Sequence, residues 1–138
     1  MNSLIFPILA QAGLILCLGL WLVWARMGSV ARGKVSIKDV RKKGEWPAGW
    51  IRNAADNFNH QFELPILFFV LCFALIHLDV VSDVANFFAW LFVASRIVHS
   101  LIQLSVNHIP TRFIIFILGV VCTIALFIVA VSAALSAA

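Results

Sequence analysis

The sequence is poor in charged residues, which make up only 12% of its 138 positions. Soluble domains carry a charge at about a quarter of their positions. Apolar residues account for 63% of the chain, and its mean hydropathy is +1.04. A chain with so few polar side chains cannot cover a water-soluble globule, so its apolar surplus must face lipid. The composition therefore predicts an integral membrane protein.

Cysteine is scarce, and its spacing excludes a disulfide framework or a thiolate metal centre. Cys17, Cys72 and Cys122 each lie within an apolar run, and the sequence contains no CxxC pair. It contains no HxxxH pair either. His99 falls at membrane depth, but without a second ligand at helical spacing we interpret it as a hydrogen-bonded core histidine. No metal is expected.

Acidic residues are few, six against ten basic ones, and the net charge is +4. Eight of the basic residues fall in one segment: Arg26, Arg32, Lys34, Lys38, Arg41, Lys42, Lys43 and Arg52. A basic cluster between hydrophobic spans is a topology signal and a contact for anionic lipid head groups. Membrane lipids are therefore expected partners, and nucleic acid is not.

Several apolar runs are long enough to cross a ~30 Å hydrocarbon layer at ~1.5 Å per residue. Short connections make neighbouring spans antiparallel. The expected fold class is therefore an all-α integral membrane protein, a single antiparallel four-helix transmembrane bundle over residues 1–138. The helices are expected at about 4–25, 54–78, 84–106 and 113–136, with a polar loop over about 26–53.

The positive-inside rule orients these spans. Both connections that carry Arg and Lys, 26–53 and 107–112, fall on one side of the bundle. The connection on the other side carries Asp79 and Asp83. We expect a multi-pass protein of a bacterial inner membrane, with the long basic loop in the cytoplasm and both termini outside.

Polar side chains at membrane depth recur at steps of three and four residues, which places them on helical stripes. One stripe lies on the second span: Arg52, Asp56, Asn59 and Glu63. The other lies on the third span: Arg96, His99 and Gln103. An ionisable side chain at mid-bilayer costs at least ~2.5–3.5 kcal/mol, so both stripes are expected to face the protein interior.

Glu63 and Arg96 fall at matching depths, about 14 and 15 Å from the same boundary. We predict an ion pair between them, and loss of either partner is expected to destabilise the bundle by several kcal/mol. Pro65 removes one backbone hydrogen bond and is expected to bend the second span. For Asn59 and Gln103, contact between helices and ligand binding remain equally open interpretations.

The third span and the connection after it resemble the pattern R-x-x-H-x-x-x-Y followed, after six residues, by P-x-R. Its positions are held by Arg96, His99, Gln103, Pro110 and Arg112. The second span resembles R-x-x-x-N-x-x-E-x-x-P at Asn59 and Pro65. On these residues the chain resembles the MAPEG family, the membrane-associated proteins of eicosanoid and glutathione metabolism, over about residues 54–113.

The sequence departs from this pattern at three positions. Gln103 replaces the tyrosine, and the chain contains no tyrosine at all. Phe62 stands at the glutamate position, with Glu63 displaced by one residue, a rotation of about 100° on a helix. Ala55 stands at the arginine position, and Arg52 comes one turn earlier. Half of the glutathione-binding pattern is therefore missing or moved.

The resemblance implies a homotrimer that binds glutathione between subunits, with arginines on its carboxylates. It implies that Arg112 is the catalytic residue, which stabilises the thiolate that attacks a lipophilic electrophile. It also provides the candidate cofactor-binding residues: Asn59, Glu63, Arg96, His99 and Gln103.

Three functions remain open at this stage. The first is a glutathione-dependent transferase, peroxidase or isomerase that acts on lipophilic electrophiles. The second is a non-catalytic protein of the same fold that binds a lipid or another hydrophobic small molecule. The third is an accessory subunit of a larger membrane complex. Because the pattern is incomplete, we give the enzyme the same weight as the other two functions taken together.

Overall fold

The computed structural model describes residues 3–137. Its helices are α1 (Ile5–Ala31), α2 (Ile37–Lys43), α3 (Trp50–His60), α4 (Leu64–His77), α5 (Asp83–Leu104) and α6 (Ile109–Ala137). Four helical segments are long and apolar enough to cross a membrane, with α3 and α4 together forming the second, Trp50–His77. The predicted all-α, four-span fold class is confirmed.

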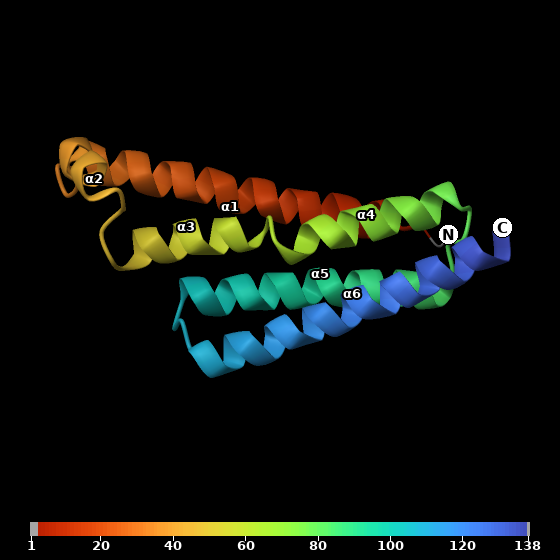
Figure 1. Ribbon diagram of the computed structural model, residues 1–138. Coiled ribbons are helices and arrows are strands. Elements are labelled where there is room, and N and C mark those ends of the chain that lie inside the picture. The colour runs from red at the N-terminus through yellow and green to blue at the C-terminus, as the bar shows by residue number, and fades with distance from the viewer. Residues whose placement is uncertain (1–2, 138) are drawn as a thin grey trace.

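The spans run alternately in opposite directions (Figure 1). The start of α1 and the end of α6 lie at one end of the bundle, and α2 lies at the other. α5 packs against α1, α3 and α6, and most extensively against α6. The start of α5 is fixed by Ser82, whose hydroxyl accepts a hydrogen bond from the Ala85 backbone N–H at 3.1 Å.

The first helix is longer than expected, because it continues past the predicted end near residue 25 to Ala31. The fall in hydropathy at Arg26 marks the lipid boundary and does not end the helix. Gly33, two residues past the end of the helix, adopts φ 67°. The Lys34 N–H then bonds to the Ser29 carbonyl at 3.0 Å, closing a left-handed C-terminal turn that favours glycine.

The second span is interrupted, and the interruption is sharper than the bend expected at Pro65. α3 ends at His60, and α4 begins at Leu64 with Pro65 in its first turn. A proline ring clashes with the carbonyl four residues earlier and cannot bond to it. That carbonyl belongs to Gln61, so the helix breaks before Pro65. The Phe62 N–H instead closes a tight turn on the Asn59 carbonyl at 2.9 Å.

The interior of the bundle is apolar at the end nearer the chain termini. Phe68 of α4 and Phe92 of α5 stack there with ring centroids 4.4 Å apart, and both are fully buried. Cys72 and Cys122 are buried in the same cluster, as small packing residues. The other end of the interior is polar, and it contains the residues considered next.

Candidate functional site

Four buried polar residues connect three helices at the interruption of the second span. Asn57 of α3 and Ser100 of α5 bond twice: the Ser100 hydroxyl donates to Asn57 Oδ1 at 3.0 Å, and Asn57 Nδ2 donates to the Ser100 carbonyl at 3.2 Å. Gln61 Nε2 donates to the Ser100 hydroxyl at 3.3 Å. Gln11 Nε2 of α1 donates to Gln61 Oε1 at 3.1 Å. We call these four residues the amide network.

Sequence reasoning missed the amide network. Asn57 and Gln61 are four residues apart and therefore form a polar stripe of their own, beside the stripe of charged residues. Gln11 was visible as an amide within the first apolar run. Amides within apolar runs are expected to be buried in a membrane protein. The prediction instead assigned the polar face of the second span to its charged residues.

Glu63 and Arg96 do not form the predicted ion pair. Glu63 lies 3.2 Å from His60 Nδ1, and its side chain is 59% exposed. The prediction assumed one continuous helix through Glu63, whereas the interruption takes this residue off the α3 stripe. Glu63 still attracts the Arg96 guanidinium electrostatically, at a distance longer than that of an ion pair.

Arg96 is buried, with 1% of its surface exposed, as the polar stripe on the third span predicted. Its Nε and Nη1 atoms have no hydrogen-bond partner within residues 3–137. Gly119 of α6 lies beside it, because a Cβ on that residue would be in ordinary van der Waals contact with Arg96 Nη1, at 3.8 Å. A guanidinium in this position supplies positive potential to the polar end of the interior.

His99 and Gln103 occupy the same face of α5 as Arg96 and are also buried. The His99 ring lies edge-on to that of His60, with centroids 6.0 Å apart. His99 Nδ1 and Gln103 Oε1 have no hydrogen-bond partner in the described part of the chain. Each can therefore accept a bond from a ligand, and His99 Nδ1 can donate one in its other tautomer.

Arg112 lies in the first turn of α6, just after Pro110. One of its terminal nitrogens donates to Asn107 Oδ1 at 2.5 Å, and Asn107 Nδ2 donates to Asn53 Oδ1 at 3.5 Å. Asn107 adopts φ 47°, a conformation that asparagine tolerates better than most residues. The Arg112 Nε atom is buried and has no partner among the residues described.

A polar pocket of about 430 Å³ opens between α3, α5 and the start of α6. It is lined by Asn53, Asp56, Asn59, His60, Glu63, Gln103, Asn107 and Arg112. Asp56 and Asn59 of the charged stripe thus come together here with Glu63, although Glu63 has left the α3 helix. Arg52 does not, because it turns away to bond to the Trp46 carbonyl and to Glu45.

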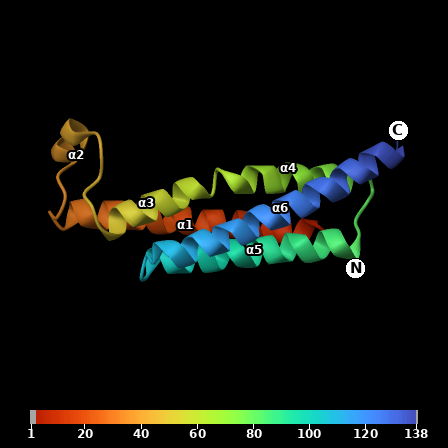
Figure 2. The same cartoon turned by 60° about the horizontal axis from the view of Figure 1, so that its bottom comes forward.

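A second pocket, also about 430 Å³, adjoins the first on the α6 side. Its lining is His60, Glu63, His99, Ile109, Arg112, Phe113 and Phe116. α6 starts beside the end of α5 and reaches α4 further along, where Gly119 lies against Leu64 (Figure 2). We call this lining, with its α6 side chains Ile109, Phe113 and Phe116, the apolar pocket.

The comparisons with known proteins decide the family. The sequence model of the MAPEG family matches residues 4–132, nearly the whole chain. The chain belongs to the MAPEG family. The resemblance first noted over residues 54–113 is thereby confirmed and extends to α1 and α6. No curated protein and no solved structure matches the chain.

This MAPEG protein combines the family's membrane four-helix fold with an altered set of side chains at the pockets. Gln103, at the tyrosine position, lines the polar pocket. Glu63, displaced by one residue, lines both pockets, whereas Phe62 at the glutamate position lines neither. The displacement of Glu63 thus leaves a carboxylate in the polar pocket.

Proposed function

We propose that this MAPEG protein binds glutathione in the polar pocket and directs its sulphur at a lipophilic electrophile in the apolar pocket. The observation that carries the proposal is the junction of the two pockets. They share His60, Glu63 and Arg112. A reaction between a polar thiol and a hydrophobic compound requires adjoining pockets of this kind. Each volume lies within the range of about 300–1,000 Å³ that is typical of small-molecule sites.

The polar pocket complements the groups of glutathione. The tripeptide carries two carboxylates, one ammonium group and two amides. The guanidinium of Arg112 suits a carboxylate or thiolate, and the carboxylates of Asp56 and Glu63 suit the ammonium. Asn59 and Gln103 supply amide groups that bond to a peptide. The proposed cofactor-binding role of these two residues rests on this arrangement.

Arg112 is the proposed catalytic residue, because its side chain lines both pockets. A nearby cation favours the ionised form of a thiol. The thiol proton passes to water, and the thiolate sulphur forms a bond to the electrophilic carbon. The electron pair of the bond that breaks leaves with the substrate's leaving group or remains on the substrate. Arg112 thus stabilises charge without exchanging a proton.

Two further residues on α5 support this site. His99 lines the apolar pocket beside the junction, and its buried Nδ1 has no hydrogen-bond partner among the described residues. Arg96 lines neither pocket. We therefore assign Arg96 a positioning role, in which its buried charge raises the affinity of the neighbouring pockets for anions.

The exposure of Glu63 supports an oligomer. α3 rises about 15 Å from Trp50 to His60, and Glu63 lies just past its end, within the second span. A lipid-exposed ionisable group at such depth costs at least ~2.5–3.5 kcal/mol, so the pockets need a cover. We propose that neighbouring subunits of a homotrimer provide it. We further propose that the pockets open toward the cytoplasm, with both termini outside a bacterial inner membrane.

The test is a titration of the full-length protein in detergent with glutathione, followed by far-ultraviolet thiolate absorbance and by calorimetry. Arg112→Ala is expected to abolish the thiolate signal and to weaken binding about 10–100-fold, as for a charged hydrogen bond worth about 1.5–3 kcal/mol. Arg32→Ala is the matched control, because Arg32 is exposed and outside both pockets. S-methylglutathione should bind without the thiolate signal.

Two outcomes contradict the proposal. The absence of saturable glutathione binding at millimolar concentration would contradict the hypothesis that the protein is a glutathione-dependent enzyme. Retention of a lipid or another hydrophobic compound would then favour the non-catalytic binding protein, and co-purification with larger partners at fixed stoichiometry would favour the accessory subunit. Binding without a thiolate signal in the unaltered protein would remove the role of Arg112.

A further inference from the structure

The net charge of the protein is concentrated in one segment outside the proposed glutathione site. Residues 26–53 contain eight basic and two acidic residues and therefore carry a charge of +6. The rest of the chain carries −2, from two basic and four acidic residues. The proposed glutathione site does not explain this charge, because Asn53 is the one residue of the segment that lines the polar pocket.

Trp46 holds this segment in a defined shape. The Arg26 guanidinium lies 4.9 Å from the centre of the Trp46 ring, which connects the segment to α1. The Trp46 carbonyl accepts bonds from Arg52 Nε at 3.2 Å and Nη2 at 2.7 Å. Arg52 also pairs with Glu45 at 3.0 Å. Arg26 and Arg52 are thus engaged within the protein, whereas the cations on α2 have no acidic partner within 4 Å in the described chain.

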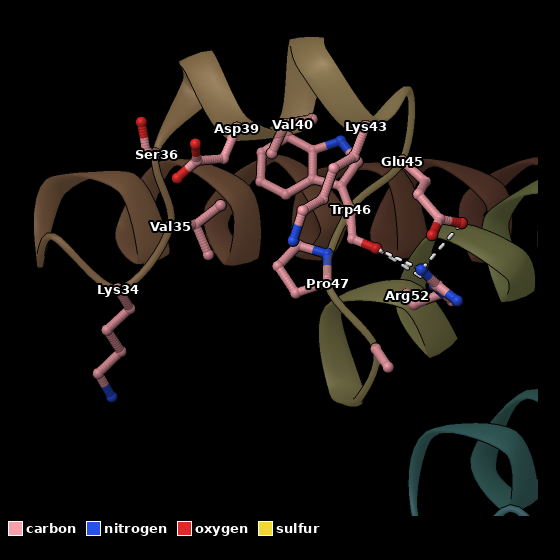
Figure 3. A pocket seen from close by; sticks show the side chains of 11 residues that line it. Lys34, Val35, Ser36, Asp39, Val40, Lys43, Glu45, Trp46, Pro47 and Arg52 are labelled. Atoms are coloured by element: carbon pink, nitrogen blue, oxygen red, sulfur yellow. Dashed lines mark hydrogen bonds and ion pairs between the residues drawn. The ribbon is translucent and has the colours of Figure 1, made fainter.

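These contacts shape a pocket of about 480 Å³ between α2 and the chain that leads into α3. The Lys43 side chain passes beside Trp46 and reaches Pro47, and Lys34 extends away from the group (Figure 3). Val35 and Val40 supply apolar surface to the same pocket. The pocket thus combines Lys43, with Lys34 at its edge, and an apolar wall.

The depth of the pocket places it among lipid head groups. Trp21 and Trp24 are exposed on α1, with ring centroids 5.4 Å apart, and Trp50 is exposed at the start of α3. Tryptophan side chains gather at the boundary between hydrocarbon and water. Arg26 follows Trp24 by two residues, about 3 Å along the helix. Trp46, beside Arg26, therefore lies near this boundary.

We propose that this pocket binds the head group of an anionic glycerophospholipid. Lys43 and Lys34 neutralise the phosphate, and the glycerol region contacts Val35, Val40 and Pro47. The charges that line the pocket favour an anionic head group over a neutral one. Glu45 is already paired with Arg52, and the remaining carboxylate, Asp39, faces two lysines. The bound lipid fixes α2 at the membrane surface.

Native mass spectrometry of the full-length protein, released from nanodiscs of mixed phosphatidylglycerol and phosphatidylcholine, tests the proposal. The doubly substituted Lys34→Gln/Lys43→Gln protein is expected to retain phosphatidylglycerol at least about 10-fold less well than the matched control does, since it loses charged hydrogen bonds to the phosphate. Lys38→Gln/Lys42→Gln is the matched control. It removes the same charge from exposed positions on α2 that do not line the pocket.

Three results overturn the proposal: equal losses in the two double variants, no loss in either, or equal retention of phosphatidylcholine. Equal losses mean diffuse attraction between the basic segment and the membrane. Inorganic phosphate at millimolar concentration should not displace the lipid, because it lacks the apolar part that contacts Val35 and Val40. The helical content and thermal unfolding of both variants must match the unaltered protein. Glutathione binding is expected to be unchanged, so failure here leaves the proposed function standing.

Discussion

Ser100→Ala, compared with Ser95→Ala, tests the amide network directly. Both serines are buried on α5, at 2% and 3% exposure, and both substitutions remove one hydroxyl. The Ser100 hydroxyl donates to Asn57 and accepts from Gln61, so its bonds join α5 to the interrupted second span. The Ser95 hydroxyl donates to the Phe92 carbonyl within α5, at 2.6 Å.

The expected magnitude follows from these bonds. Polar contacts between helices in membranes contribute about 0.6 kcal/mol on average, and at most about 1.7. Ser100→Ala removes two such contacts, at 3.0 and 3.3 Å, and should lower the free energy of unfolding by about 1–2 kcal/mol. Ser95→Ala should cost less than about 0.5 kcal/mol, because its bond adds little to a carbonyl already bonded within the helix.

Reversible unfolding in mixed micelles measures both values. A double-mutant cycle of Ser100→Ala with Gln61→Met should give a coupling energy of about 0.5–1 kcal/mol, as for residues in one hydrogen-bond network. The reasoning is refuted if the two serine variants unfold with the same free energy, or if the cycle is additive. Either result would mean that packing alone holds the polar end of the bundle together.

Gly119→Leu should destabilise the bundle by about 1–3 kcal/mol, because a Cβ there already lies 3.3 Å from the Ser95 hydroxyl. Gly13→Leu is its control, since no atom lies within 4 Å of that Cβ position; equal unfolding free energies would contradict the close contact at α6. Glu63→Gln should change thermal stability by less than about 1 kcal/mol, because a glutamine can keep the 3.2 Å contact with His60 as a hydrogen bond. A loss of several kcal/mol would reinstate the ion pair with Arg96.

The sequence was sufficient to predict the four spans and the buried face of α5. Arg96, His99 and Gln103 recur on a regular helix, so their periodicity correctly predicted burial. The same reasoning failed on α3, where two polar stripes compete. Polar identity alone could not show that Asn57 lies inside while Asp56 lies at the surface of a pocket.

The interruption explains most of the remaining difference. Pro65 predicted a disturbance of the second span, but its location depends on the carbonyl of Gln61, four residues earlier. The depth of Glu63 could be read from its position along the chain. Its direction could not, because direction depends on dihedral angles at the break, where Glu63 has φ −94° and ψ −97°.

The same interruption allows one membrane crossing to change neighbours halfway. Its first half, α3, packs on α1 and α5, and its second half, α4, packs mainly on α6. α6 packs against the second half of this span far more than against the first. The side of the bundle at Phe113 and Phe116 is therefore open, and the apolar pocket lies there. Under the proposed function, a hydrophobic compound dissolved in the bilayer would reach Arg112 from this side, wherever neighbouring subunits leave the flank uncovered, without passing through the head-group layer.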